Sequence, residues 1–137
     1  MSTSDATDPI RIVAALIDDG AGRALLVRKH GSTHFMQPGG KPEPGEEALT
    51  TLARELREEL GVGIVPGSAR RLGAFEHDAV NEAGRRVYAE VFAVRIDGIP
   101  HVQAEIAELT WLAVSPPWPV AVAPLSATYI LPLLAGS

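Results

Sequence analysis

The sequence predicts a single domain of the α/β class, in which a mixed sheet lies between helices. One amphipathic segment, residues 46–60, has the period of a helix, and several strand-like segments precede and follow it. The chain has 137 residues, which is the length of one domain. We therefore expect one domain over residues 9–137, preceded by a flexible tail over residues 1–8.

Two strands are predicted ahead of the helix. Residues 10–18 and 24–29 are rich in aliphatic side chains, and Asp19-Gly20-Ala21-Gly22 between them has the composition of a tight turn. We expect these two segments to pair as a β-hairpin. A loop rich in glycine and proline follows over residues 30–41.

The central helix is the best-marked element of the sequence. It is expected to begin at about Glu46, with two acidic residues in its first turn, where they favour the helix dipole. Gly61, the usual residue of a left-handed helix stop, should end it after Leu60. The apolar positions of its expected buried face are Leu49, Leu52, Ala53, Leu56 and Leu60.

The remaining segments complete the expected sheet and add a final helix. The turn chemistry of residues 81–84 separates two strands, and the proline-rich residues 115–119 form a rigid linker. Pro132 is expected to strain the end of the last helix. The expected strands are residues 71–76, 86–96 and 108–114, and the final helix is residues 126–134.

Composition restricts the classes of function. The formal net charge is −5 and the 12 lysines and arginines are dispersed, so polymeric nucleic acid is an unfavourable partner. A small polyphosphate could still bind together with a divalent cation. The absence of cysteine excludes thiolate catalysis and cysteine-ligated zinc. We expect no membrane partner and a cytoplasmic location, since the N-terminal residues lack the layout of a signal peptide.

Three acidic residues share one face of the central helix. Glu55, Glu58 and Glu59 fall within an arc of roughly 100°, because residues three and four apart lie on the same side. At about 6 Å and an effective dielectric near 20, each pair of carboxylates costs roughly 3 kcal/mol. A solvated acidic face is the common explanation of such a pattern. A magnesium or manganese ion would relieve the repulsion, since both prefer carboxylate oxygens.

Neighbouring residues supply other components of a site for phosphate chemistry. Arg54 lies one turn before Glu58 and can orient an acid through a charge-assisted fork. Gly39 and Gly40 allow the backbone to approach the helix closely, so that a carbonyl oxygen can join the ligands of a metal. Metal ions in such sites neutralise an anionic substrate and activate water.

The spacing of these residues resembles the signature of the Nudix hydrolases. That signature is Gly, five residues, Glu, seven residues, Arg-Glu-apolar, any residue, Glu-Glu, any residue, Gly-apolar. All of its positions are matched. Seven of them require one particular residue type, and an accidental match of these seven is expected about once in 10⁸ starting points. The matching residues are Gly40, Glu46, Arg54-Glu55-Leu56, Glu58-Glu59 and Gly61-Val62.

The resemblance extends over nearly the whole chain and implies a fold and a metal site. The implied fold is an α/β/α sandwich with a mixed sheet, in which the signature forms a loop, a helix and a second loop. Mg²⁺, for which Mn²⁺ can substitute, would be held by Glu58, Glu59 and the carbonyl oxygen of Gly39.

The resemblance also implies roles for other acids. Glu55 would bind metal or act as the base that activates water, and Glu46 and Arg54 would orient the catalytic carboxylates. A further acidic ligand is expected from a later loop. Glu105 is the preferred candidate, because its distance from the following tryptophan resembles that in relatives that clean the nucleotide pool; Glu108 is the alternative.

Candidate residues for substrate binding surround the signature. Arg28, Lys29 and Lys41 could meet the phosphates, although each could equally be a surface cation. Phe35 and Met36 could line a base pocket or pack in the core.

The expected reaction is hydrolysis of a pyrophosphate bond in a small nucleoside diphosphate derivative. A (deoxy)nucleoside triphosphate, giving a monophosphate and pyrophosphate, is the preferred substrate. Hydrolysis of ADP-ribose or a nucleotide sugar, a nucleotide-binding module without catalysis, and a structural protein with an acidic helix are the alternatives. Either a monomer or a homodimer is compatible with the sequence.

Overall fold

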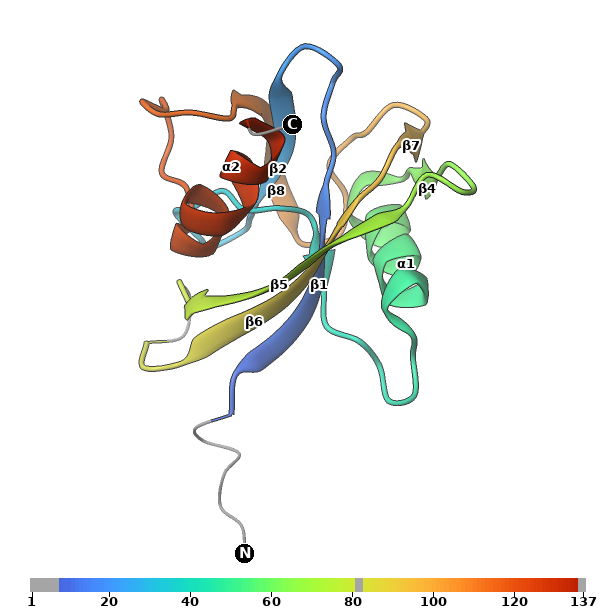
Figure 1. Cartoon of the computed structure of the whole chain (residues 1–137), viewed down its shortest axis with the longest axis horizontal. Coiled ribbons are helices and arrows are strands. Elements are labelled where there is room, and N and C mark those ends of the chain that lie inside the picture. Colours follow the sequence, from blue (N-terminus) through green and yellow to red (C-terminus); the bar gives the residue numbers. More distant parts are fainter. Residues whose placement is uncertain (1–7, 81–82, 136–137) are drawn as a thin grey trace, which may run out of the picture.

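The computed structural model of the chain describes residues 8–80 and 83–135, so the predicted tail lies outside the described residues except for Asp8. Figure 1 shows helix α1 (Ala48–Leu60) on one side of the strands and the C-terminal helical segment, residues 126–135, on the other. The strands form the layer between them. The predicted α/β class and α/β/α arrangement are therefore confirmed.

The central sheet is mixed, with the strand order β3-β1-β6-β5. Strand β1 (Ile10–Leu16) pairs in parallel with β6 (Arg86–Ala93) and antiparallel with the short β3 (Gly39–Gly40). Strand β5 (Arg70–Asp78) pairs antiparallel with β6 and completes the sheet. The pairing of β3 with β1 brings Gly40, the first residue of the signature, and the preceding Gly39 to the edge of this sheet.

The hairpin predicted for the first two strands forms only at its turn. The N–H of Asp19 donates to the carbonyl oxygen of Arg23 at 3.0 Å. The N–H of Leu25 also donates to the carbonyl oxygen of Ile17 at 2.9 Å. Along the rest of its length β2 (Arg23–Lys29) pairs antiparallel with β8 (Ile106–Ala113). The predicted hairpin is therefore confirmed next to its turn and not along the rest of the two strands, because local composition defines a turn, whereas the main partners of the strands come from other parts of the chain.

The later strands differ from prediction in their limits. The strand predicted over residues 86–96 divides into β6 and the short β7 (Ile96–Asp97). Strand β7 pairs with β4 (Gly63–Ile64), which the sequence analysis did not predict. Within the turn predicted over residues 81–84, positions 81 and 82 lie outside the described residues.

Helix α1 begins two residues later than predicted. Glu47 is its N-cap residue and its first turn contains no acid, so the expected dipole stabilisation by two acids is wrong. The helix ends as predicted: Gly61 is left-handed, with φ 69°, and its N–H donates to the carbonyl oxygen of Arg57 at 3.0 Å. Leu49, predicted to be buried, is 43% exposed because it stands in the first turn, away from the core cluster that covers the rest of this face.

Two hydrophobic clusters lie on opposite faces of the strands. Alternate residues of β1 and β2 point to opposite faces, so both strands are buried on both sides. The cluster under α1 includes Val13, Ile17, Leu25, Val27, Leu52, Leu56 and Leu60. The cluster under the C-terminal segment includes Leu16, Leu26, Phe35, Val91, Leu125, Ile130 and Leu131.

The predicted final helix is present with an irregular beginning. Residues Ser126–Ile130 form a wide π-type turn, and α2 continues from it over Leu131–Ala135. Pro132 is the second residue of α2 and follows directly on this wide turn, so the helical segment is irregular next to the proline. None of the helices in the described part of the chain has the length and apolar character needed to cross a membrane.

Candidate active site

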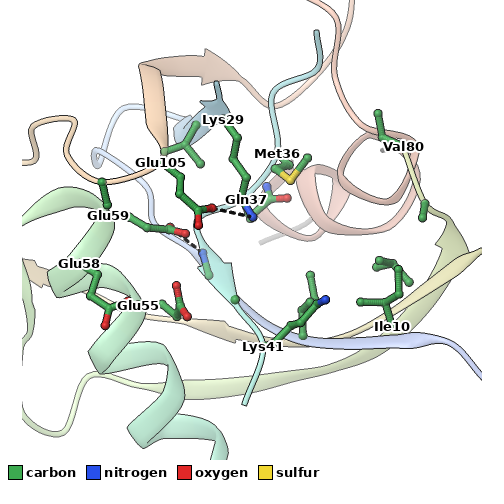
Figure 2. A pocket seen from close by; sticks show the side chains of 17 residues that line it. Ile10, Lys29, Met36, Gln37, Lys41, Glu55, Glu58, Glu59, Val80 and Glu105 are labelled. Carbon is green, nitrogen blue, oxygen red and sulfur yellow. Dashed lines mark hydrogen bonds and ion pairs between the residues drawn. The ribbon is translucent and has the colours of Figure 1, made fainter. Parts of the chain in front are cut away.

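A cleft of about 430 Å³ lies between α1, β3 and the loop that precedes β8. Figure 2 shows three carboxylates of α1, those of Glu55, Glu58 and Glu59, on one side of it. Glu105, from the loop before β8, lies close to them. The structure thus brings four of the predicted acidic residues to one end of a single cleft.

Arg54 connects the acidic residues of the signature. Its guanidinium donates to both carboxylate oxygens of Glu46, from Nε at 2.9 Å and from Nη2 at 2.8 Å. Nη1 donates to Glu55 Oε2 at 2.9 Å and lies 3.6 Å from Glu58 Oε1. Nη2 also donates to the carbonyl oxygen of Lys41 at 3.1 Å. One planar cation therefore fixes two acids and the loop that leads into the helix.

Glu46 is held as an anion outside the helix. The guanidinium of Arg54 lowers the pKa of Glu46 to about 2, and the backbone N–H of Glu43 and the hydroxyl of Thr51 act in the same direction. The Thr51 hydroxyl, which is fully buried, donates to Glu46 Oε1 at 2.7 Å. Thr51 could not be recognised from the sequence, because a threonine on a helix face carries no motif of its own.

Glu59 is the buried member of the acidic cluster. It is 6% exposed, and its Oε1 accepts a hydrogen bond from the N–H of Gly39 at 3.2 Å. Burial raises the pKa of Glu59 to about 8, and the negative charges of Glu55 and Glu105 contribute to the rise. The charged form of this side chain is therefore unfavourable until a cation enters the cleft.

The loop that carries Glu105 is fastened to the end of α1. Gln103 Nε2 donates to the carbonyl oxygens of Arg57 and Glu58 at 2.6 and 3.0 Å. The backbone N–H of Gln103 donates to the carbonyl oxygen of Glu59 at 3.1 Å. The bonds to Glu58 and Glu59 also satisfy carbonyl groups at the helix end, whereas the carbonyl of Arg57 already accepts the N–H of Gly61. Sequence analysis missed Gln103, because its partners become neighbours only in the folded chain.

Two further features define the surroundings of Glu105. Ala104, with φ 54°, is in the left-handed region and also lines the cleft. Lys29 Nζ lies 3.9 Å from Glu105 Oε1, which places a cation beside the acidic end.

The structure separates the predicted substrate-binding residues into two groups. Lys29 and Lys41 line the cleft (Figure 2). Arg28 does not line it, and its Nε donates to Glu108 Oε1 at 2.7 Å outside it. Phe35 is buried in the cluster under the C-terminal segment. Of the two acids left open as the distal ligand, Glu105 lines the cleft and Glu108 does not.

The donor set fits a hard divalent cation. Carboxylate oxygens are the ligands that Mg²⁺ prefers, and the buried Glu59 is an anion that a cation would stabilise. As the side chains stand, no three acidic or histidine side chains of the described residues converge on one metal position. The side chains of Glu58 and Glu105 are 54% and 78% exposed, so both have room to turn towards an ion.

Comparison with known sequences gives a family match over most of the chain. The profile of the NUDIX domain matches residues 8–128. A protein from Halorhodospira halophila (strain DSM 244 / SL1), named RNA pyrophosphohydrolase, is 39% identical over 62 residues, which are 45% of this chain. That match spans only 33% of the length of the relative.

Solved structures share the fold over most of the chain. A nudix hydrolase family member from Chromobacterium violaceum has a TM-score of 0.72 at 26% identity, over 94% of this chain and 78% of that chain. The E. coli ORF135 protein has a TM-score of 0.67 at 27% identity, over 95% of this chain and 89% of that chain. The MutT NUDIX hydrolase from Burkholderia pseudomallei, at 24% identity, shares the fold with a TM-score of 0.70, over 94% of this chain and 97% of that chain. Because the family profile covers most of its length, this chain belongs to the Nudix hydrolase family.

Proposed function

We propose that the chain is a Mg²⁺-dependent pyrophosphohydrolase that converts a (deoxy)nucleoside triphosphate into a monophosphate and pyrophosphate. One observation carries the proposal: four carboxylates and the ammonium groups of Lys29 and Lys41 line the same cleft of about 430 Å³. Anionic oxygens suit a metal, and the cations suit the phosphates that this metal accompanies. Membership of the family gives the hydrolase class, and the substrate is our proposal.

The residues that would hold Mg²⁺ are Glu58, Glu59 and Glu105, with the carbonyl oxygen of Gly39 as a further ligand. When bound, the ion supplies positive charge that neutralises the phosphate oxygens. Mn²⁺ can take the same donors. Glu55 has two proposed roles, as an additional ligand or as the base that accepts a proton from the attacking water.

The protein's own groups bind and orient the reactants. Lys29 and Lys41 would pair with phosphate oxygens, and Arg54 would keep Glu55 in place through its fork to Glu46. The oxygen of water forms a bond to the α- or the β-phosphorus, and the bond from that phosphorus to the bridging oxygen breaks. Attack at the α-phosphorus expels pyrophosphate with the electron pair, and attack at the β-phosphorus expels the monophosphate. The proton of the water passes to a carboxylate.

An apolar side pocket of about 70 Å³ adjoins the cleft and would receive the base. The two share Ile12, Met36, Gln37, Ala79, Val80 and Val87. A substrate with phosphates at the acidic end and a ring at the apolar end therefore matches the arrangement.

The relative named RNA pyrophosphohydrolase supports pyrophosphate hydrolysis, and it makes triphosphorylated RNA a useful test compound. ADP-ribose and nucleotide sugars are the alternative substrates. A cytoplasmic location and a monomeric or homodimeric state stay predictions.

The test is a panel of substrates incubated with Mg²⁺ or Mn²⁺, with the products separated by chromatography. The panel contains canonical and oxidised dNTPs, NTPs, ADP-ribose, nucleotide sugars, dinucleoside polyphosphates and a 5′-triphosphorylated oligoribonucleotide. We expect the highest kcat/KM on a nucleoside triphosphate. In Glu59→Gln the kcat/KM on this substrate should be at least about a hundredfold lower, because the change removes an essential charge. Binding without turnover, or near-full activity of Glu59→Gln, would contradict the proposal.

A further inference from the structure

A buried carboxamide lies where the cleft meets its apolar side pocket. Gln37 is 6% exposed and lines both spaces, next to Met36 (Figure 2). The surrounding wall of the side pocket is mainly aliphatic and includes Ile12, Val87 and Ile130. A flat ring could be held between such side chains, but aliphatic walls discriminate poorly between one ring and another.

Ser126 holds this carboxamide in one orientation. Ser126 is 2% exposed and stands at the beginning of the C-terminal helical segment, where its hydroxyl donates to Gln37 Oε1. Gln37 Nε2 then remains buried without a hydrogen-bond partner among the described residues. A buried donor without an acceptor is destabilising, so this atom indicates a ligand that supplies the acceptor.

The other polar side chains of the pocket already have partners. Asp78 Oδ1 accepts a hydrogen bond from Arg86 Nη1 at 3.0 Å. The hydroxyl of Ser126 is used by Gln37. Among the polar side chains described around the side pocket, Gln37 is therefore the one that offers an unused donor.

We propose that Gln37, oriented by Ser126, is the residue that determines base specificity. In this assignment Nε2 donates to a ring nitrogen or a carbonyl oxygen on the edge of a base seated in the side pocket. The inference rests on the proposed function, because it assumes that the phosphates of the same nucleotide lie at the acidic end. Of the two residues that could line a base pocket or pack in the core, Phe35 lies in the core and Met36 lines both spaces.

The kinetic test compares base selectivity in three variants. The quantity measured is the ratio of kcat/KM between the best and the poorest of the four canonical dNTPs. Gln37→Met keeps the length of the side chain but lacks the donor, and should reduce this ratio about tenfold through KM, with kcat changed less than about threefold. Ser126→Ala should reduce it by a smaller factor. Ser32→Ala removes a buried hydroxyl that does not line the cleft, and should leave the ratio unchanged.

A second measurement does not depend on turnover. The side-chain amide resonances of Gln37, assigned by their loss in Gln37→Met, are followed by NMR while AMP, GMP, CMP and UMP are added in EDTA. We expect them to shift with at least one monophosphate, and to shift less in Ser126→Ala.

The two measurements separate failure of the inference from failure of the proposed function. Triphosphate hydrolysis with a selectivity ratio that Gln37→Met leaves unchanged, or with unshifted amide resonances, overturns the inference and leaves the function intact. Shifted resonances without hydrolysis of any nucleotide support the inference and overturn the function. A wild-type ratio near one overturns the specificity role.

Discussion

The carboxylate of Glu55 occupies the space in which a side chain on Gly40 would stand. A Cβ atom at residue 40 would lie 2.6 Å from Glu55 Oε1, well inside van der Waals contact. At Gly39 the obstacle is backbone, because a Cβ would lie 2.9 Å from the Cα of Ala14, and φ there is 151°. Gly40 therefore makes room for the carboxylate of Glu55, and Gly39 allows β3 to pair with β1.

Alanine at these two glycines should have different consequences. Gly40→Ala should lower kcat/KM about a hundredfold, because the displaced Glu55 no longer stands in a productive position. Its Tm should fall by no more than about 3 °C, since a side-chain end can move aside. Gly39→Ala should lower Tm by more than about 8 °C, since the backbone of β1 cannot yield. Steady-state kinetics and thermal unfolding of the two variants test this difference. An equal fall in Tm in Gly39→Ala and Gly40→Ala would contradict it.

Replacing Arg54 by lysine should reduce activity although the charge is kept. Lysine cannot donate to both oxygens of Glu46 and to Glu55 at once, so kcat should fall about ten- to a hundredfold. Arg71→Lys is the matched control, because Arg71 pairs with Glu90 at 2.8 Å outside the cleft. A similar loss of kcat in both variants would argue against an orienting role for Arg54.

Glu59 should make the metal-free protein less stable at high pH. The carboxyl has a folded-state pKa of about 8 and an ordinary value of 4.5, so its contribution is fully favourable below pH 4.5 and is lost as pH rises through 8. Relative to Glu59→Gln, the wild type should lose on the order of 4 kcal/mol of unfolding free energy between pH 4.5 and 9. Denaturant unfolding in EDTA measures this. Parallel pH profiles of the two proteins would show that Glu59 is not desolvated.

Magnesium should stabilise the wild type through the same residue. A cation that binds the folded state alone raises Tm, and the effect should increase from pH 6 to pH 8.5 because Mg²⁺ competes with the proton on Glu59. In Glu59→Gln the rise in Tm should be at most a third of the wild-type value. Thermal unfolding with MgCl₂, and again after EDTA is added, tests the metal site without a substrate. An equal rise in both proteins would place the ion elsewhere.

Glu105 and Glu108 should differ in their effect on catalysis. Glu105→Gln should lower kcat about tenfold or more with Mg²⁺, because it removes a proposed ligand from the cleft. Glu108→Gln breaks an exposed ion pair with Arg28 and should change kcat less than about twofold. The pair carries its own control, since both changes remove one charge from neighbouring positions. The reverse order of effects would assign the distal acid to Glu108.

The sequence by itself determined the parts of this protein that depend on local geometry. Helical spacing alone places Glu55, Glu58 and Glu59 on one side, and the structure finds all three in one cleft. The left-handed end of α1 at Gly61 also follows from the residue type. The fixed spacings of the signature indicated the family because the helix and its two flanking loops are one continuous segment of chain, in which spacing in sequence sets position in space.

The tertiary structure alone decided which distant residues meet. The register of β2 against β8 shifts at a bulge between Arg28, which stands opposite Glu108, and Lys29, which stands opposite Ile106. This register places Glu108 in the ladder and leaves Glu105 in the loop beside the cleft. The choice between the two acids depends on strand pairing across about eighty residues, and the pattern of apolar residues in either strand does not specify a bulge.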